Sequence, residues 1–167
     1  YRVEEHVGAG AMGDVYRAVQ PTIGKHVAVK VIKRKLAGSE EAIERFVREA
    51  RTANRIGHPN VVDVFAMGRL GDGRLWLAMD FLEGESLGRR LRRTGPMTPE
   101  AMLEILRPMC EALAAAHDKN VVHRDLKTDN VFLAGDRVYV LDFGIAKVLA
   151  DVLATGIKER LTTEGAW

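Results

Sequence analysis

Three glycines near the amino terminus have the spacing of a phosphate-binding loop. Gly8, Gly10 and Gly13 lie in the run GAGAMG between two expected strands, and not at the start of a helix. A dinucleotide-binding motif would need the glycines to open a helix, and a Walker-type loop would need Lys and then Ser or Thr after the last glycine. A glycine-rich hairpin can instead lay backbone amides over phosphates, because residues without a Cβ let the main chain approach closely. Taken alone, the run favours a tight hairpin that binds no ligand.

A lysine and a glutamate further along the chain could add a charged group to such a site. Lys30 follows Val27–Val29 on the third expected strand, and Val29 and Val31 must point to the opposite face of that strand. Glu49 lies in the middle of the next expected helix. A lysine held by a glutamate in a cleft is a positioned cation suited to phosphate oxygens. Without the glycines upstream, the two residues would be interpreted as a surface ion pair.

The most specific pattern lies in the second half of the chain. The run VVHRDLKTDN at 121–130 is followed, after a short hairpin, by LDFG at 141–144. Together with the glycines, Val15, Lys30 and Glu49, these runs resemble the eukaryotic-type (Hanks-type) protein kinases in order and spacing. The segments most similar to bacterial serine/threonine kinases of this kind are HPNVV at 58–62 and GPMTPEAM at 95–102.

The resemblance implies phosphoryl transfer from Mg-ATP to a protein hydroxyl. Asp125 would accept or orient the proton of the acceptor hydroxyl, and Lys127 would stabilise charge on the γ-phosphoryl group. A lysine at position 127 favours Ser/Thr over Tyr as the acceptor. The residues expected to act in catalysis are Asp125, Lys127, Lys30 and Glu49, and the expected Mg²⁺ ligands are Asn130 and Asp142.

The same resemblance implies a nucleotide pocket. Val15 and Ala28 would enclose the adenine from the sheet side, and Leu133 would form the floor. Met79 would occupy the gatekeeper position, and backbone groups of residues 80–82 would hydrogen-bond the base. The complete set of expected ATP contacts is Val7, Gly8, Ala9, Gly10, Ala11, Met12, Gly13, Val15, Ala28, Lys30, Met79, Asp80, Leu82 and Leu133.

Regulation is expected close to the catalytic segment. A buried guanidinium at Arg124 could be neutralised by a phosphate on the segment after DFG. Thr162 and Thr163 are the candidate autophosphorylation sites, and two exposed loop threonines are the alternative. His123 is expected to be a packed residue that anchors the loop to Phe143.

A short helix at 86–93 is strongly basic. Its arginines are Arg89, Arg90, Arg92 and Arg93. They could attract an acidic substrate or partner, or they could form an ordinary solvated helix face.

These residues need a framework, and the apolar pattern predicts one of the α+β class. Residues 1–83 are expected to form a kinase-like N-lobe, an antiparallel five-stranded sheet with one helix. Its helix should begin after the N-cap Ser39 and end at Gly57. The expected strands are 1–7, 15–19, 26–32, 61–67 and 75–81.

Residues 84–167 are expected to form an incomplete helical C-lobe, which completes a bilobal fold. Thr98 and Pro99 open a long helix that runs to His117, and Pro108 is expected to bend it. The expected strands of this lobe are 131–133 and 138–141. The resemblance implies that further helices follow in the complete domain, so the chain is expected to be the amino-terminal part of it.

Composition restricts the class of protein further. The 167 residues carry 25 Lys and Arg against 23 Asp and Glu, a formal charge of +2, which argues against a nucleic-acid partner. The single cysteine, Cys110, allows no intrachain disulfide, so a reducing, cytoplasmic location is expected. No apolar run approaches the roughly 18 to 20 residues that span a bilayer. An anchor beyond residue 167 stays open.

Two functions from different classes remain. The first is an ATP-dependent serine/threonine protein kinase that acts in signalling, with ATP and Mg²⁺ as cofactors and a protein as substrate. The second is a non-catalytic nucleotide-binding or regulatory fragment. Intact Lys30, Asp125, Asn130 and Asp142 disfavour a pseudokinase, whereas the length of the chain favours a fragment that binds nucleotide weakly.

Overall fold

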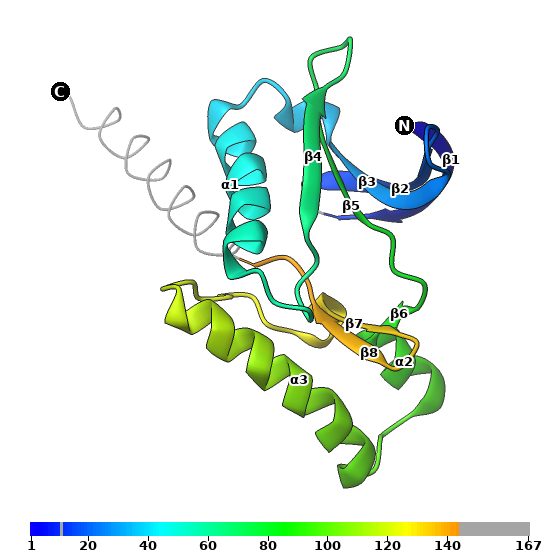
Figure 1. Ribbon diagram of the computed structural model, residues 1–167, viewed down its shortest axis with the longest axis vertical. Coiled ribbons are helices and arrows are strands. Elements are labelled where there is room, and N and C mark those ends of the chain that lie inside the picture. Colours follow the sequence, from blue (N-terminus) through cyan, green and yellow to red (C-terminus); the bar gives the residue numbers. More distant parts are fainter. Residues whose placement is uncertain (11, 144–167) are drawn as a thin grey trace, which may run out of the picture.

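A five-stranded antiparallel sheet forms the first half of the molecule. The computed structural model describes residues 1–10 and 12–143. Its first sheet has the strand order β1-β2-β3-β5-β4 (Figure 1). The strands are β1 (Arg2–Ala9), β2 (Gly13–Gln20), β3 (Lys25–Ile32), β4 (Val64–Arg69) and β5 (Leu75–Asp80). The predicted antiparallel five-stranded sheet is therefore confirmed.

Helix α1 (Glu40–Ile56) packs on one face of this sheet and follows a short 3-10 helix, η1 (Arg34–Leu36). The Ser39 hydroxyl accepts a hydrogen bond from the Ala42 amide at 3.2 Å, which satisfies one of the free N–H groups at the helix start. Gly57 ends the helix with φ 54°, a left-handed conformation that glycine adopts without a Cβ penalty. Both predicted helix limits are confirmed.

The two faces of the sheet carry separate apolar clusters. Phe46 of α1 is fully buried against Ile32 and Leu77 on the inner face. Val29 and Val31 pack on the outer face with Ala78. Alternate residues of a strand point to opposite faces, so Lys30 lies on the same face as Ile32 and α1.

The second half is built from helices around a small sheet. Helix α2 (Leu87–Thr94) and helix α3 (Pro99–Asp118) are capped by Ser86 and Thr98, whose side chains accept backbone amide hydrogen bonds. The three-stranded sheet has the order β6-β7-β8, and a 3-10 helix, η2 (Thr128–Asn130), precedes β7. The strands are β6 (Glu85–Ser86), β7 (Val131–Ala134) and β8 (Arg137–Val140). No helix among residues 1–10 and 12–143 is long and apolar enough to cross a membrane.

The segment between α1 and β4 ties the two halves together. The Asn60 side-chain amide donates to the Val138 carbonyl at 2.7 Å, and the Asn60 carbonyl accepts from the Val140 amide at 2.8 Å. Val61 forms an isolated parallel bridge with Val140. The prediction that β4 begins at residue 61 is therefore wrong: β4 begins at Val64, because residues 60 and 61 pair with β8 instead.

A tight backbone contact joins the segment after β5 to β7. A Cβ added at Gly84 would lie 1.9 Å from the Leu133 carbonyl oxygen, whereas one added at Gly71 would meet nothing within 4 Å. We expect Gly84→Ala to lower the free energy of unfolding by about 1–3 kcal/mol, because the strand pair must separate to fit the methyl group.

Urea denaturation of both variants provides the measurement. Gly71→Ala, the matched control, should stay within about 0.5 kcal/mol of the parent chain. Equal stabilities for the two variants would show that the contact does not constrain the fold.

Candidate active site

Lys30 and Asp142 meet although they are far apart in the sequence. The Nζ of Lys30 on β3 lies 3.2 Å from Oδ1 of Asp142, 112 residues later in the chain. Lys30 is 8% exposed, and the Asp142 side chain is 41% exposed. A buried ammonium group needs a nearby anion, and this contact supplies one where the two halves of the molecule face each other.

The position of Asp142 depends on the residue before it. The Leu141 amide donates to the Asn130 carbonyl at 2.8 Å, and the Leu141 carbonyl accepts from His123 Nε2 at 2.8 Å. Asp142 follows with φ 56°, a left-handed conformation that turns the chain sharply after β8. Phe143 is then 2% exposed. Both backbone groups of Leu141 are held, which constrains the main chain that leads into Asp142.

His123 connects this turn to the loop of residues 121–130. Its ring is buried, with 3% exposure, and its centroid lies 4.7 Å from that of Phe143. Nδ1 accepts from the Asp125 amide at 3.3 Å while Nε2 donates to Leu141, which is the pattern of the neutral Nε2–H tautomer. The predicted packing of His123 against Phe143 is confirmed.

Asp125 lies at the centre of a small polar network. The Asn130 side-chain amide donates to the Asp125 carbonyl at 2.8 Å and to its Oδ2 at 3.2 Å. Lys127 Nζ donates to the same Oδ2 at 2.7 Å. This hydrogen bond holds the pKa of Asp125 below its ordinary 3.8 and the pKa of Lys127 above its ordinary 10.5. The pair is therefore ionised at neutral pH.

Oxygen ligands for a divalent cation lie on both sides of this network. The nitrogen of the Asn130 amide is used by Asp125, which leaves its oxygen as the acceptor. Asp142 contributes a carboxylate from the neighbouring turn. Mg²⁺ is commonly bound by one or two protein oxygens together with substrate phosphates, and the oxygens of Asn130 and Asp142 match this coordination preference.

The glycine run forms the hairpin between β1 and β2. The Gly10 amide donates to the Gly13 carbonyl at 2.8 Å. A Cβ at Gly13 would lie 2.6 Å from the Val31 carbonyl oxygen, so only glycine allows β2 to approach β3 there. Gly8 has open space where a Cβ would lie. Ala11 is outside the described residues, and Met12 is buried in the cluster under α1.

The residues expected around the adenine share the inner face of the first sheet. Val15 is paired with Lys30, and Ala28 is paired with Met79, in the antiparallel ladders. Directly paired residues point to the same face, so these four side chains lie together. Leu133 is buried on β7, in the second half of the molecule.

The remaining expected contacts lie at the margins of this surface. Val7 and Ala9 are exposed on β1, and Leu82 is half-buried after β5. Asp80 is the last residue of β5, and its carboxylate lies 2.8 Å from Lys25 Nζ. Their contacts with a nucleotide stay predictions.

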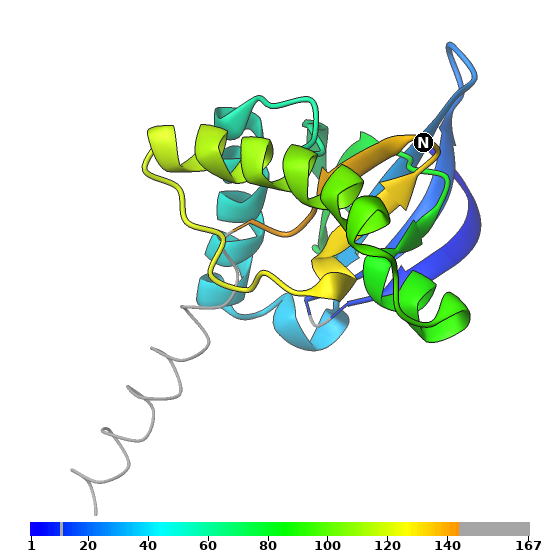
Figure 2. The same cartoon turned by 90° about the horizontal axis from the view of Figure 1, so that it is seen from below.

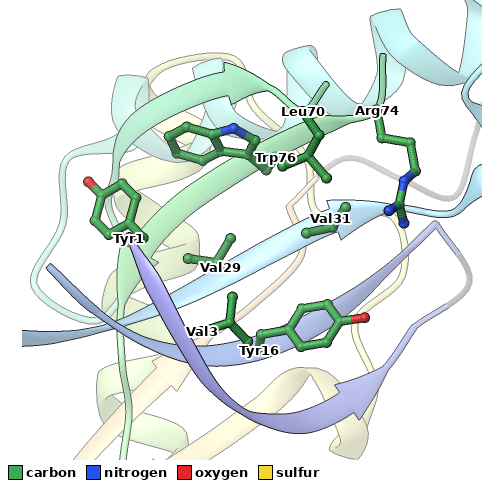
Figure 3. Close-up of a pocket in the computed structure, with 8 residues that line it drawn as sticks. All are labelled: Tyr1, Val3, Tyr16, Val29, Val31, Leu70, Arg74 and Trp76. Atoms are coloured by element: carbon green, nitrogen blue, oxygen red, sulfur yellow. The ribbon is translucent and has the colours of Figure 1, made fainter. Parts of the chain in front are cut away.

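A separate apolar hollow lies on the outer face of the sheet. Figure 3 shows side chains of β1, β2, β3 and β5 lining it. Its volume is about 350 Å³. Its lining residues are Tyr1, Val3, Tyr16, Val29, Val31, Leu70, Arg74 and Trp76. Because Val29 and Val31 point away from the Lys30 face, this hollow is distinct from the candidate active site.

Several sequence predictions need correction or lie outside the described residues. Arg124 is exposed with φ 64°, so the prediction of a buried guanidinium is wrong, because no described element packs over it. Thr162 and Thr163 lie outside the described residues, as does the side chain of Glu49, whose backbone belongs to α1. The role of Leu141 was missed, because its contacts are made by backbone groups and not by its side chain.

Comparison with known proteins identifies the family. A family model described as the protein kinase domain matches residues 1–164. The serine/threonine-protein kinase pkn3 of Myxococcus xanthus is 40% identical over 153 residues, which cover 89% of this chain and 28% of pkn3. PknE of Mycobacterium bovis is 38% identical over 164 residues, which cover 98% of this chain and 29% of PknE.

Solved structures agree with the sequence relatives. The crystal structure of the PknI kinase domain of Mycobacterium tuberculosis aligns with a TM-score of 0.71 and 33% identity. The alignment covers 87% of this chain and 58% of that one. The chain thus spans less than a third of the curated relatives' length and about three fifths of the PknI chain, and the expected kinase fold is confirmed.

The contact between Lys127 and Asp125 predicts a measurable titration effect. We expect Lys127→Gln to raise the pKa of Asp125 toward 3.8, because the cation and its hydrogen bond are lost. A lowered carboxyl pKa stabilises the fold above the unfolded pKa, and this stabilisation disappears as pH falls through the folded value. The raised pKa of Lys127 stabilises the fold below the unfolded pKa of lysine. This stabilisation disappears as pH rises through the folded pKa of Lys127.

Carbon-detected NMR titration of the Asp125 carboxyl group measures this shift. Lys35→Gln is the matched control, because Lys35 is exposed on η1 and is not among the groups that lower the pKa of Asp125. An unchanged Asp125 titration in Lys127→Gln would contradict the described contact.

Proposed function

The chain belongs to the protein kinase family, and on that premise we propose that it is part of a serine/threonine kinase catalytic domain. In this proposal the complete domain transfers the γ-phosphate of Mg-ATP to a Ser or Thr hydroxyl of a protein. The observation that carries the proposal is the convergence of Lys30 with Asp142, next to the Asp125 network. Three separate segments thereby present the charges that phosphoryl transfer requires.

In this proposal the phosphates of ATP lie beneath the β1–β2 hairpin. Lys30 binds phosphate oxygens from the sheet side, and the backbone amides of the glycine run approach from above. Asn130 and Asp142 would hold Mg²⁺ through their oxygens, and the ion would supply positive charge that offsets the charge of the phosphates.

Asp125 orients the acceptor hydroxyl toward the γ-phosphorus. The hydroxyl oxygen forms the new P–O bond, the bond from the γ-phosphorus to the β–γ bridging oxygen breaks, and ADP leaves. The hydroxyl proton passes to Asp125 Oδ2. While Lys127 donates to this oxygen the carboxylate is a weak base, because its pKa is lowered. Once Lys127 turns to the γ-phosphoryl group, Asp125 becomes a better proton acceptor.

The partners follow from this chemistry. The substrate is a protein with a Ser or Thr acceptor, and Thr162 or Thr163 of the chain itself is a candidate for autophosphorylation. The proposed site of action is the cytoplasm, where ATP is available and Cys110 stays reduced.

A second candidate is a regulatory segment that binds nucleotide without transferring phosphate. The observation that supports it is the contact between Lys30 and Asp142, because these two groups can hold a nucleotide without any transfer of phosphate. The two functions differ in one property, because only the kinase incorporates phosphate into protein.

Substitution of Asp125 tests the kinase function in the polypeptide that contains this segment with the rest of its domain. We expect Asp125→Asn to reduce phosphate incorporation about 10²- to 10⁴-fold, because the hydroxyl loses its proton acceptor. ATP affinity should change little. Radiolabelled phosphate transfer and nucleotide binding measure the two quantities separately.

Asp118→Asn provides the matched control, since Asp118 is exposed at the end of α3. It should transfer phosphate at the parent rate. Undiminished transfer by Asp125→Asn would refute the assigned role, and absence of transfer in the parent with retained ATP binding would favour the regulatory segment.

A further inference from the structure

The basic helix α2 is only partly neutralised by its neighbours. Arg90 Nε and Arg93 Nη2 lie 2.6 Å and 2.5 Å from Oε1 of Glu85. These two hydrogen bonds lower the pKa of Glu85 to about 2. A single carboxylate, 14% exposed, therefore serves two guanidinium groups.

The other two arginines of α2 face solvent. The Arg92 side chain is 69% exposed, and its Nη2 lies 3.3 Å from Asp129 Oδ1. Arg89 is exposed, and its guanidinium makes no hydrogen bond or ion pair with any residue the structure describes. Four positive charges are thus balanced by two carboxylates, which leaves a local surplus on a chain of nearly balanced total charge.

This surplus lies directly beside the candidate active site. A Cβ added at Gly88 of α2 would meet Asp129 Oδ1 at 2.4 Å and Thr128 Oγ1 at 3.0 Å, so α2 is packed tightly on η2. Asp129 precedes Asn130, whose amide lies 3.2 Å from Asp125 Oδ2. Figure 2 shows α2 in green next to the short yellow helix that contains these residues.

We propose that Arg89 and Arg92 form a docking surface for acidic side chains of the protein substrate. This inference rests on the proposed kinase function, because it assumes that the acceptor hydroxyl lies at Asp125. Asp129 is four positions after Asp125, so their Cα atoms are at most about 15 Å apart. An extended peptide covers that distance in about three to five residues. The acidic residues therefore lie about three to five positions from the acceptor.

An acidic peptide fits this surface better than a nucleic acid does. The positive charge is confined to a few side chains of one short helix, and Asp125 and Asp129 lie beside it. A phosphate backbone would bring its charges against both carboxylates, whereas a peptide can place acids at α2 and a neutral hydroxyl at Asp125.

Peptide binding to the polypeptide that contains this segment with the rest of its domain tests the proposal without requiring turnover. Fluorescent peptides would carry one Ser and a block of three Glu, Gln or Lys residues, placed three to five positions before or after it. Fluorescence anisotropy at about 50 mM salt measures the affinity of each peptide. The Glu peptide should bind about three- to tenfold more tightly than the Gln peptide, and only when the block lies on one particular side of the Ser. The preference should shrink at about 300 mM salt, because exposed charges are screened.

Two variants locate the effect. Arg89→Gln combined with Arg92→Gln should abolish the preference for Glu. The change removes the Arg92 partner of Asp129, but the Asp129 carboxylate is exposed and stays solvated. Arg107→Gln, a change of an exposed arginine on α3, should retain it. Equal binding of Glu and Gln peptides overturns the proposal, as does a preference that survives the double change, or tight binding confined to a single-stranded oligonucleotide.

Mg-ATP binding by the same protein separates this inference from the proposed function. Nucleotide binding without a peptide preference refutes only the docking surface. A preference for acidic peptides that depends on Arg89 and Arg92, found without nucleotide binding, supports the surface and counts against the kinase assignment.

Discussion

The arrangement of the site depends on how the backbone of Leu141 is held. Its amide is bound by the Asn130 carbonyl and its carbonyl by His123 Nε2, so the chain leaves β8 in one direction. Asp142 can then adopt a left-handed conformation and reach Lys30, while Phe143 is buried against His123. The same His123 accepts from the Asp125 amide. One backbone unit thus couples the position of Asp142 to the network around Asp125.

Local sequence signals were sufficient to predict most of the helices and strands of the fold. Ser39 and Gly57 limit α1, and Thr98 with Pro99 opens α3, because capping acts within a few residues of the helix end. The start of β4 could not be predicted in this way. Residues before it are held by β8, which lies far later in the chain, and no local pattern encodes that pairing.

The residue types of the site could be predicted from the sequence, but the contacts between them could not. The spacing of the motifs identified Lys30, Asp125, Asn130 and Asp142 as candidates, and the structure brings them together in two adjoining contacts. The lowered pKa of Asp125 depends on a 2.7 Å contact that spacing alone does not specify. The exposure of Arg124 was missed for a similar reason, since burial depends on which elements pack over a residue.

The most direct test of the account is a double-mutant cycle on Mg-ATP affinity, measured by calorimetry with Lys30→Met, Asp142→Asn and both changes together. The account predicts that each single change weakens Mg-ATP binding at least about tenfold. The loss of affinity in the double variant should be smaller than the product of the two single losses, because both groups act on one bound nucleotide. The control Lys35→Met should bind as the parent does, since Lys35 is exposed. Equal affinity in all four proteins would contradict the central claim that Lys30 and Asp142 form one phosphate-binding site.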